Sequence, residues 1–214
     1  MLNSPRNSSK PWAIVLAAGA SIRMGRCKAE LPWLNGTTLL SYQIEQLLMA
    51  GITPVVVLGP HNAQLLKPWA APGQVVINYH PEAGKVSSIV TGLKHIPRDF
   101  QALMIVAVDQ PRPQWIYQTL LQAHLSANVP LTAPAYKGRT GHPLVFSTAV
   151  WMALEGLSEE TLGLRQIVQV FSERIHYVEF ETADVLMDLN TPESYQAALL
   201  RYSSQTFDEQ LVEW

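Results

Sequence analysis

The chain has 214 residues, with 15 Lys and Arg against 17 Asp and Glu, 48% hydrophobic residues and one cysteine. This length is enough for one sizeable core, and a net charge of −2 provides no basic field for nonspecific binding of nucleic acid or an anionic membrane. A single cysteine excludes an internal disulfide and a zinc site of the CxxC type, so we expect a reducing, cytoplasmic location.

Both ends of the chain are polar. Residues 1–11 lack the apolar core of a secretory signal and are predicted to form a flexible N-terminal segment, and residues 203–214 a polar C-terminal tail. Residues 12–202 are predicted to form one domain, because no linker or repeat divides them. The apolar runs are far shorter than the ~18 to 20 residues that a bilayer helix needs. We therefore expect no membrane partner and, given the charge balance, no nucleic-acid partner.

Short apolar runs alternate with amphipathic stretches in the first half of the chain. Aliphatic and β-branched runs predict strands at 12–17, 54–58, 74–78 and 102–108. Apolar residues at helical spacing predict a helix at 39–50, capped by Thr37 or Thr38 and stopped by Gly51, a short helix at 62–67, a helix capped near Ser87, and a helix at 113–125.

The rhythm changes in the second half. Strands are predicted at 131–135 and 143–147, joined by a glycine-containing hairpin or crossover, with later strands at 175–180 and 185–189. Helices are predicted at 148–155, at 159–170 and from Thr191-Pro192-Glu193 onward. The alternation of strands and helices predicts an α/β domain with a mostly parallel sheet and helices on both faces.

The loop after the first strand has an unusual composition. In an open α/β sheet, ligands bind beyond the carboxyl ends of the strands. Two glycines and several small residues between Ala17 and Lys28 allow backbone N–H groups to approach an anion, and Arg23, Arg26 and Lys28 add three cations. The loop matches neither GxxxxGK[ST] nor GxGxxG. It suits a triphosphate, although a solvated basic loop with a turn glycine is the alternative.

Asp109 follows the fourth predicted strand in the sequence VDQP. A carboxylate is the hard oxygen ligand that Mg²⁺ prefers, and Mg²⁺ commonly uses one or two protein ligands together with substrate phosphates. Taken alone, Asp109 is explained as well by a cap on the turn before the next helix. A triphosphate loop beside this carboxylate would instead form a magnesium–nucleotide site.

Four motifs occur in a distinctive order along the chain: LAAGASIRMGRCK at 16–28, VDQP at 108–111, GHPLVF at 141–146 and DLNTPESY at 188–195. In this order and spacing, the chain resembles the molybdenum cofactor nucleotidyltransferases over residues 12–202, and it is most similar to the molybdopterin cytidylyltransferase branch. The resemblance implies a Rossmann-like domain that binds a nucleoside triphosphate with Mg²⁺. It further implies transfer of the nucleotidyl group to the terminal phosphate of molybdopterin, with release of pyrophosphate.

The resemblance also implies roles for individual residues. The catalytic residues would be Arg23, Lys28 and Asp109, with the two cations stabilising the triphosphate and the departing pyrophosphate and Asp109 binding Mg²⁺. The nucleotide would contact the loop and a second segment near the helix at Ser87; its full set of residues is Leu16, Ala17, Ala18, Gly19, Ser21, Arg23, Lys28, Ser87 and Ser88. An ordinary helix cap is an equally good explanation of Ser87 alone.

The acceptor would contact Lys85, Gly141 and His142. A neutral imidazole can hydrogen-bond a phosphate or a pterin, and a protonated one can pair with the terminal phosphate. Alternatively, the restriction imposed by Pro143 fixes His142 at the start of a strand without any role in binding.

The second metal ligand is open between two residues. Related enzymes carry Asp or Asn two residues before the proline of the last motif, a position that Asn190 holds here, and Asp188 stands two residues earlier. An amide oxygen can bind Mg²⁺ but adds no negative charge. We expect Asn190 to be the ligand and keep Asp188 as the alternative; Asn190 could also be a simple turn residue.

The base is expected to be cytosine. Guanine presents adjacent N–H donors that a carboxylate reads well, whereas backbone groups can read cytosine. The guanylyl branch typically has an acid soon after the third strand, but here that strand is followed by Asn78-Tyr79-His80, with Glu82 further on. CTP is therefore favoured over GTP.

Two other functions remain open. An enzyme of the same fold could transfer the nucleotide to a sugar or polyol phosphate, and a noncatalytic protein could bind the nucleotide or the cofactor. Asn190 in place of a carboxylate would support the noncatalytic function. Molybdoenzyme maturation proteins are further candidate partners.

Overall fold

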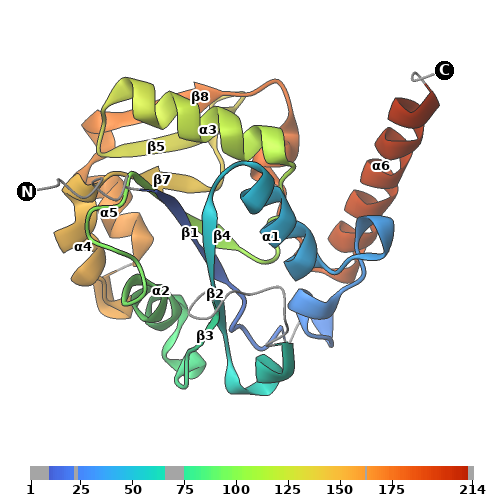
Figure 1. Ribbon diagram of the computed structural model, residues 1–214, viewed down its shortest axis with the longest axis horizontal. Helices are drawn as coiled ribbons and strands as arrows, with labels where there is room; N and C mark the ends of the chain where they lie inside the picture. The colour runs from blue at the N-terminus through green and yellow to red at the C-terminus, as the bar shows by residue number, and fades with distance from the viewer. Residues whose placement is uncertain (1–9, 22–23, 66–74, 162, 212–214) are drawn as a thin grey trace, which may run out of the picture.

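The computed structural model describes residues 10–21, 24–65, 75–161 and 163–211. Its centre is an eight-stranded mixed sheet in the order β3-β2-β1-β4-β7-β5-β6, with β8 paired to β5 (Figure 1). The strands are β1 (Pro11–Leu16), β2 (Thr53–Leu58), β3 (Val75–Ile77), β4 (Ala102–Ala107), β5 (Leu131–Tyr136), β6 (Arg139–Thr140), β7 (Leu144–Phe146) and β8 (Ile175–Glu179). The α-helices are α1 (Leu39–Met49), α2 (Lys85–Leu93), α3 (Gln114–Ala127), α4 (Trp151–Glu155), α5 (Leu164–Val170) and α6 (Pro192–Leu211).

The four strands formed by the first half of the chain, β1 to β4, are parallel to one another. β1 lies between β2 and β4, with Ile14 paired to Val55 on one side and to Ile105 on the other. β3 continues this parallel set, and β8 is parallel to β5, whereas β7 runs antiparallel to both β4 and β5. The two predicted strands at 131–135 and 143–147 pair antiparallel as β5 and β7. The connection between them contains β6, a strand that was not predicted, which forms a hairpin with β5. The predicted mostly parallel α/β sheet is confirmed.

Helices cover both faces of the sheet, which confirms that part of the prediction. Ala13 and Val15 of β1 point into a core shared with α1, α3 and the first half of α6. Ile14 and Leu16 alternate with them and point into a second core shared with α2, α4 and α5. The central strands are therefore buried on both faces, which explains their continuous apolar sequences.

Local sequence signals set the helix ends. The Thr38 hydroxyl accepts a hydrogen bond of 3.2 Å from the backbone N–H of Ser41, which caps α1. At the start of α6, Thr191 and Ser194 exchange bonds between side-chain oxygen and backbone N–H. This helix continues to Leu211, through most of the segment expected as a polar tail, and extends away from the sheet in Figure 1.

The predicted strand at 185–189 is wrong. Residues Ala183–Leu186 form a 3-10 turn instead, although Val185 and Leu189 are fully buried. The backbone of this segment bonds to the site loops and not to a strand: Val185 O accepts from His142 N at 2.9 Å, and Leu189 N donates to Asp109 O at 2.8 Å. The apolar residues of this run are therefore buried in a segment that closes the site, and a short apolar run alone does not distinguish such a segment from a strand.

Several predicted boundaries also shift. α2 begins at Lys85 and not near Ser87, because Gly84 adopts φ 100° and the Glu159 carboxylate, from another part of the chain, accepts the Val86 N–H at 2.5 Å. The predicted helix at 62–67 is a 3-10 helix at Pro60–Leu65, and residues 66, 67 and 74 lie outside the described residues. Within the described part of the chain, no helix combines the length and the apolar character needed to cross a membrane.

Candidate active site

A cleft of about 450 Å³ opens at the carboxyl edge of the sheet, where the loops after β1 and β4 meet the start of α2. Parallel pairing makes this convergence necessary, because β1 and β4 run in register and end at the same edge. The lining residues are Leu16, Ala18, Gly19, Ala20, Ser21, Lys28, Pro81, Gly84, Lys85, Ser88, Ala107, Val108, Asp109 and Asn190. The lining thus draws on three of the four motifs singled out in the sequence and on the start of α2.

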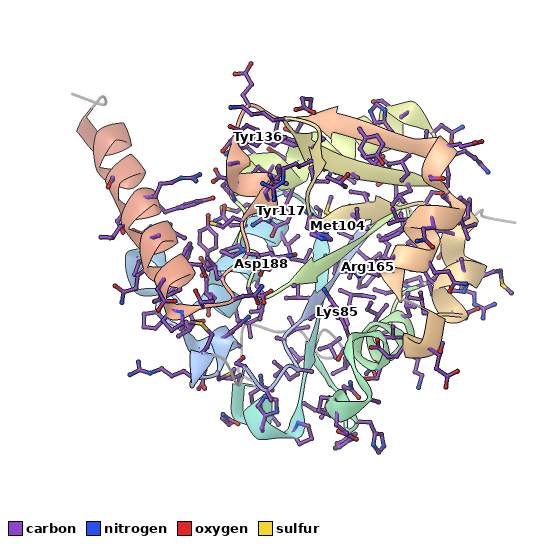
Figure 2. The ribbon with its side chains drawn as sticks, turned by 180° about the vertical axis from the view of Figure 1, so that it is seen from behind. Lys85, Met104, Tyr117, Tyr136, Arg165 and Asp188 are labelled. Atoms are coloured by element: carbon purple, nitrogen blue, oxygen red, sulfur yellow. The ribbon has the colours of Figure 1, made fainter. Side chains whose placement is uncertain are left out.

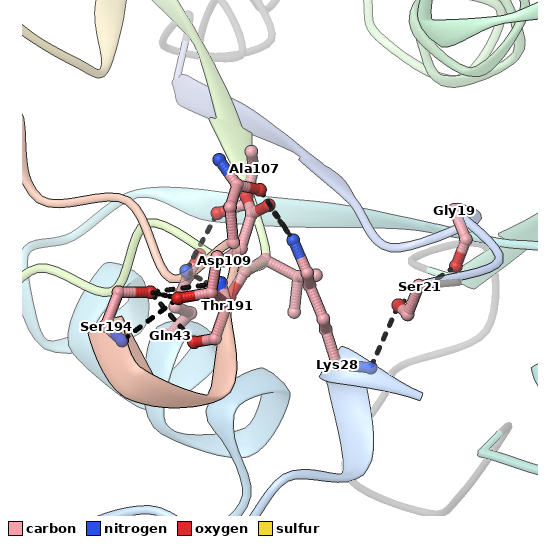
Figure 3. Close-up of polar contacts among 10 residues, drawn as sticks. Gly19, Ser21, Lys28, Gln43, Ala107, Asp109, Thr191 and Ser194 are labelled. Atoms are coloured by element: carbon pink, nitrogen blue, oxygen red, sulfur yellow. Dashed lines mark hydrogen bonds and ion pairs between the residues drawn. The ribbon is translucent and has the colours of Figure 1, made fainter. Parts of the chain in front are cut away.

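Lys28 is the central polar group of the cleft. Its ammonium nitrogen donates to Asp109 Oδ2 at 2.6 Å (Figure 3). It also donates to Asn190 Oδ1 at 2.8 Å. The side chains of Lys28 and Asp109 are only 12% and 19% exposed, so solvent weakens this ion pair less than it would on an open surface. Three residues that lie up to 162 positions apart in the sequence therefore meet around one cation.

Asp188 lies beside this group without being part of the Lys28 contact. It accepts a side-chain hydrogen bond from Asn190, which leaves the Asn190 oxygen facing Lys28. Partial burial, and then the like charge of Asp109, raise the pKa of Asp188, while Lys28, Asn190 and Lys85 act in the opposite direction. Lys85 begins α2, whereas Asp188 lies between the 3-10 turn at Ala183–Leu186 and α6 (Figure 2).

The loop after β1 is shaped around Ser21. Ser21 adopts φ 54°, in the left-handed region, and its hydroxyl accepts the Lys28 backbone N–H at 3.1 Å, which fixes the base of the lysine (Figure 3). Gly19 faces open space, since a Cβ built there meets no atom within 4 Å. Arg23, one of the three predicted catalytic residues, lies outside the described residues, and Arg26 is exposed.

Two buried amides that the sequence analysis missed support the strand ends. Asn62 donates to Ala17 O at 2.8 Å and accepts the Gly59 N–H at 2.8 Å, so it ties the loop after β1 to the end of β2. Gln43 of α1 donates to Ala107 O and Val108 O at 2.9 and 3.1 Å, just before Asp109 (Figure 3). Gln43 occupies the apolar face of its helix between Leu39 and Leu47, a signal that could have identified it.

The start of α2 brings Lys85 and Ser88 to the cleft. Asn78, at the end of β3, donates to the hydroxyls of Ser87 and Ser88 at 2.8 and 3.0 Å. The Ser87 hydroxyl also lies within hydrogen-bond distance of His80 O and Gly84 O, so its contacts are within the protein, and it is not among the residues that line the cleft. Asn78 is therefore a third supporting amide that the sequence analysis did not identify.

Gly141 and His142 lie outside the cleft lining but close to it. Gly141 packs against the backbone at Val185: a Cβ added to Gly141 would stand 2.3 Å from Val185 O. His142 keeps an exposed surface although its ring is largely surrounded by protein atoms, and its bond to Pro143 is cis. Desolvation of the ring, and then the positive charges of Lys85 and Arg112, lower the pKa of His142 to about 4, while Asp109 acts in the opposite direction. The imidazole is therefore neutral at pH 7.

Sequence comparisons agree with this geometry. Residues 13–178 match the family model of the MobA-like NTP transferase domain. The chain is 26% identical over 191 residues to the molybdenum cofactor cytidylyltransferase of Escherichia coli K12, covering 89% of this chain and 96% of that protein. It is 28% identical over 199 residues to a probable molybdenum cofactor guanylyltransferase of Bacillus thuringiensis (strain Al Hakam), covering 89% of this chain and 96% of the relative.

A structural comparison shows that the fold is shared with a solved protein. Rv0371C from Mycobacterium tuberculosis H37Rv, solved in complex with manganese, superimposes with a TM-score of 0.72 at 21% identity, covering 89% of this chain and 98% of the other. That likeness shows a shared fold. The family model spans well over half of the chain and includes both Lys28 and Asp109, which the structure joins in the cleft. The chain therefore belongs to the MobA-like NTP transferase domain family.

Proposed function

We propose that the protein transfers CMP from CTP to the terminal phosphate of a molybdopterin-type acceptor, with release of pyrophosphate. The observation that carries this proposal is the meeting of Lys28, Asp109 and Asn190 at the mouth of a cleft bordered by the loop after β1. A buried cation between oxygen ligands, next to backbone that is free to approach phosphates, suits a nucleoside triphosphate.

The oxygen donors fit Mg²⁺. Asp109 and Asn190 supply one carboxylate and one amide oxygen, which already converge on a single positive group. Mg²⁺ commonly takes one or two protein oxygens and completes its shell with phosphates and water. We assign Asn190 and not Asp188 as the second ligand, since Asp188 accepts a hydrogen bond from the Asn190 amide and thereby orients its oxygen. When bound, the metal would neutralise charge on the triphosphate.

The remaining residues would position and neutralise two anionic reactants. No covalent nucleophile is needed, because the acceptor phosphate attacks the α-phosphate directly and the oxygen bridging the α- and β-phosphates leaves with pyrophosphate. The backbone from Leu16 to Ser21 would hold the nucleotide, and Lys28 would bind triphosphate oxygens. Arg23 remains a predicted second cation, since it lies outside the described residues.

The shape and charge of the cleft favour cytosine. Asp109 is the one carboxylate among the described lining residues, and it faces Lys28. The segment between β3 and α2 contributes Pro81, Gly84, Lys85 and Ser88 to the lining. Guanine needs acceptors for its adjacent N–H groups, and these side chains offer no carboxylate for them. CTP is therefore the proposed substrate, with GTP as the less favoured nucleotide.

His142 and Lys85 are proposed to bind the acceptor. Because the imidazole is neutral at pH 7, it would donate one hydrogen bond to a phosphate or pterin, while Lys85 supplies the positive charge. Because Gly141 has no side chain, the loop between β6 and β7 that carries His142 would be able to lie close to the backbone at Val185. This division of roles leaves the triphosphate to the β1 loop and the acceptor to the side of the cleft near β6 and β7.

Incubation with Mg²⁺, each of the four nucleoside triphosphates and extracted molybdopterin tests the proposal, with pyrophosphate and the nucleotide-linked product measured. We expect product with CTP, and less with GTP. Product with a sugar or polyol phosphate alone would overturn the acceptor, and nucleotide binding without pyrophosphate release would indicate the noncatalytic function. Asp109→Asn is the control that removes the metal-binding charge while keeping the size of the side chain.

A further inference from the structure

Arg112 is a buried charge that no sequence motif had indicated. It follows the VDQP segment between β4 and α3, and it is only 1% exposed, among the largest fully buried side chains of the described chain. Desolvation lowers the pKa of its guanidinium, with the charges of Asp188 and Asp109 acting in the opposite direction. In the described part of the protein, none of its nitrogens forms an ion pair with a carboxylate.

The guanidinium donates instead to four backbone carbonyls, which we name the carbonyl cluster. Nη1 donates to Pro111 O at 2.9 Å, Nε to His142 O at 3.2 Å, and Nη2 to Val185 O at 3.2 Å and Met187 O at 2.8 Å. These acceptors belong to three separate segments of the chain. A buried charge is costly unless dipoles or counter-charges offset it. For the Arg112 guanidinium, the dipoles of these four carbonyls provide that compensation.

Each of the three segments carries a residue of the proposed site. Pro111 lies two residues after Asp109, His142 is itself the proposed acceptor contact, and Met187 is followed by Asp188 and then by Asn190. Direct bonds join the segments as well, since His142 N donates to Val185 O and Leu189 N donates to Asp109 O. The carbonyl cluster therefore joins the three segments that carry the proposed metal ligands and the proposed acceptor contact.

We propose that Arg112 is a positioning residue, which sets the spacing of Asp109, Asn190 and His142 through the carbonyl cluster. The proposal rests on the proposed function, because it assigns those three residues to metal and acceptor. Only an arginine can do this, since its planar fork presents donors in fixed directions to carbonyls on several sides. A lysine at this position would keep the charge but not the fixed geometry.

Arg112→Lys and Arg112→Met test the proposal, with Arg98→Met as the matched control. Arg98 is an exposed arginine that pairs with Glu155. For each folded variant, we would measure the affinity for CTP in the presence of Mn²⁺, the turnover number with molybdopterin, and the Mn²⁺ concentration that gives half-maximal rate. Circular dichroism and the melting temperature report the fold.

Both Arg112 variants are expected to bind CTP within about twofold of wild type at saturating Mn²⁺, because the hydrogen bonds of Arg112 within the described chain go to Pro111, His142, Val185 and Met187 and to none of the described residues of the β1 loop. Turnover should fall by roughly 100-fold, the penalty expected for a displacement of about 1 Å among reacting groups, and the Mn²⁺ requirement should rise. Arg98→Met should match wild type. An Arg112→Lys protein with wild-type turnover and Mn²⁺ requirement would overturn the positioning role, and so would a lower melting temperature without any change in turnover.

If neither Arg112 variant folds, Gly141→Ala decides the question. The added Cβ presses on Val185 O and so displaces the carbonyl cluster from the opposite side while Arg112 remains. A raised Mn²⁺ requirement with CTP affinity retained supports the proposal, and an unchanged Mn²⁺ requirement overturns it. Wild-type protein in the same assays distinguishes failure of the positioning role from failure of the proposed function. Absence of metal-dependent CTP binding in wild type would refute the proposed function itself.

Discussion

The ammonium group of Lys28 lies where two candidate metal ligands converge. Its contacts of 2.6 Å to Asp109 and 2.8 Å to Asn190 hold both oxygens on one point. A metal ion and an ammonium group cannot occupy that point together, because two cations at contact distance repel strongly where solvent is partly excluded. Metal binding therefore requires Lys28 to move, and a triphosphate gives it a new partner.

Replacing Lys28 by Met should have opposite effects on two ligands. In the absence of nucleotide, Mn²⁺ affinity should rise by roughly tenfold, about 1.4 kcal/mol, because the competing cation is gone. Turnover should fall by roughly 10 to 150-fold, since a charge-assisted hydrogen bond to the triphosphate is lost. Free Mn²⁺, measured by electron paramagnetic resonance, checks the first effect. Lys94→Met, at an exposed position, is the control, and equal Mn²⁺ affinities in all three proteins would contradict the exchange.

The second metal ligand can be identified from a ranking of variants. Asn190→Leu removes the oxygen that faces Lys28 and should raise the Mg²⁺ requirement by at least roughly tenfold, while Asn190→Asp adds a charge and should hold or lower it. Asp188→Asn should have a smaller effect, because it keeps the size of the side chain that orients Asn190. Magnesium titrations of turnover give the ranking. Greater damage from Asp188→Asn than from Asn190→Leu would make Asp188 the ligand.

For individual residues, the sequence identified the charged groups of the site better than the side chains that hold its backbone in place. Lys28 and Asp109 stood out because each follows a predicted buried strand, the place where open sheets bind ligands. Asn62 and Arg112 could not be identified, because their partners are backbone carbonyls of distant segments that only the tertiary fold brings within reach. Gln43 was missed, although its place on the apolar face of α1 was a usable signal. A side chain that donates to a backbone carbonyl needs no particular residue type as its partner. The partner therefore cannot be recognised in a single sequence.

Among the elements, α2 depends on a contact that is remote in sequence. The Glu159 carboxylate accepts the Val86 N–H, and Gly84 precedes the helix at φ 100° with no room for a side chain beside Glu159. This arrangement begins the helix at Lys85 and so presents Lys85 and Ser88 to the cleft. The sequence placed the start of this helix too late, because a serine is a common cap and the actual cap lies 73 residues away.

Gly84→Ala should therefore impair both stability and nucleotide binding. The substitution combines an unfavourable φ with a Cβ 2.2 Å from Glu159 Oε1, and we expect a loss of about 1 to 3 kcal/mol in the free energy of unfolding. CTP affinity should fall, because Ser88, a proposed nucleotide contact, moves with the helix start. Gly51→Ala is the matched control: it has φ 76° and open space, so it should cost about 1 kcal/mol without changing CTP affinity. Urea denaturation and CTP titration measure both quantities, and equal behaviour of the two variants would refute the role of the Glu159 contact.

Over the whole molecule, hydrophobic patterning was sufficient to predict the architecture. Continuous apolar runs predicted strands buried on both faces, and the two alternating sets of β1 residues do enter two separate cores. The order of strands in space, with antiparallel β7 inserted between β4 and β5, was not predictable from local patterns. Nor was the irregular 183–190 segment, since its apolar residues are buried by closing the site and not by pairing in the sheet.

The join between α3 and the distal strands makes the stability of the molecule sensitive to acid. His124 of α3 is 3% exposed, its Nδ1 lies 2.9 Å from the Thr132 hydroxyl of β5, and burial, with a smaller effect of His176, lowers its pKa to about 4. Between pH 6.5 and about 4, His124 therefore binds a proton in the unfolded chain but not in the folded chain. Its contribution to the free energy of unfolding is present above this range and is lost as pH falls through it.

This one residue should account for a loss of about 2 kcal/mol in the free energy of unfolding between pH 7 and pH 5. Asp188 contributes a slope of the opposite sign, because a carboxyl with a raised pKa holds its proton more firmly in the folded state. Comparing wild type with His124→Gln at both pH values cancels that contribution and every other shared one. Urea denaturation should show a markedly shallower pH dependence for His124→Gln, whereas His95→Gln, at an exposed position, should follow wild type. If His124→Gln loses as much stability as wild type on acidification, the acid sensitivity arises elsewhere and the buried histidine is protonated at little cost.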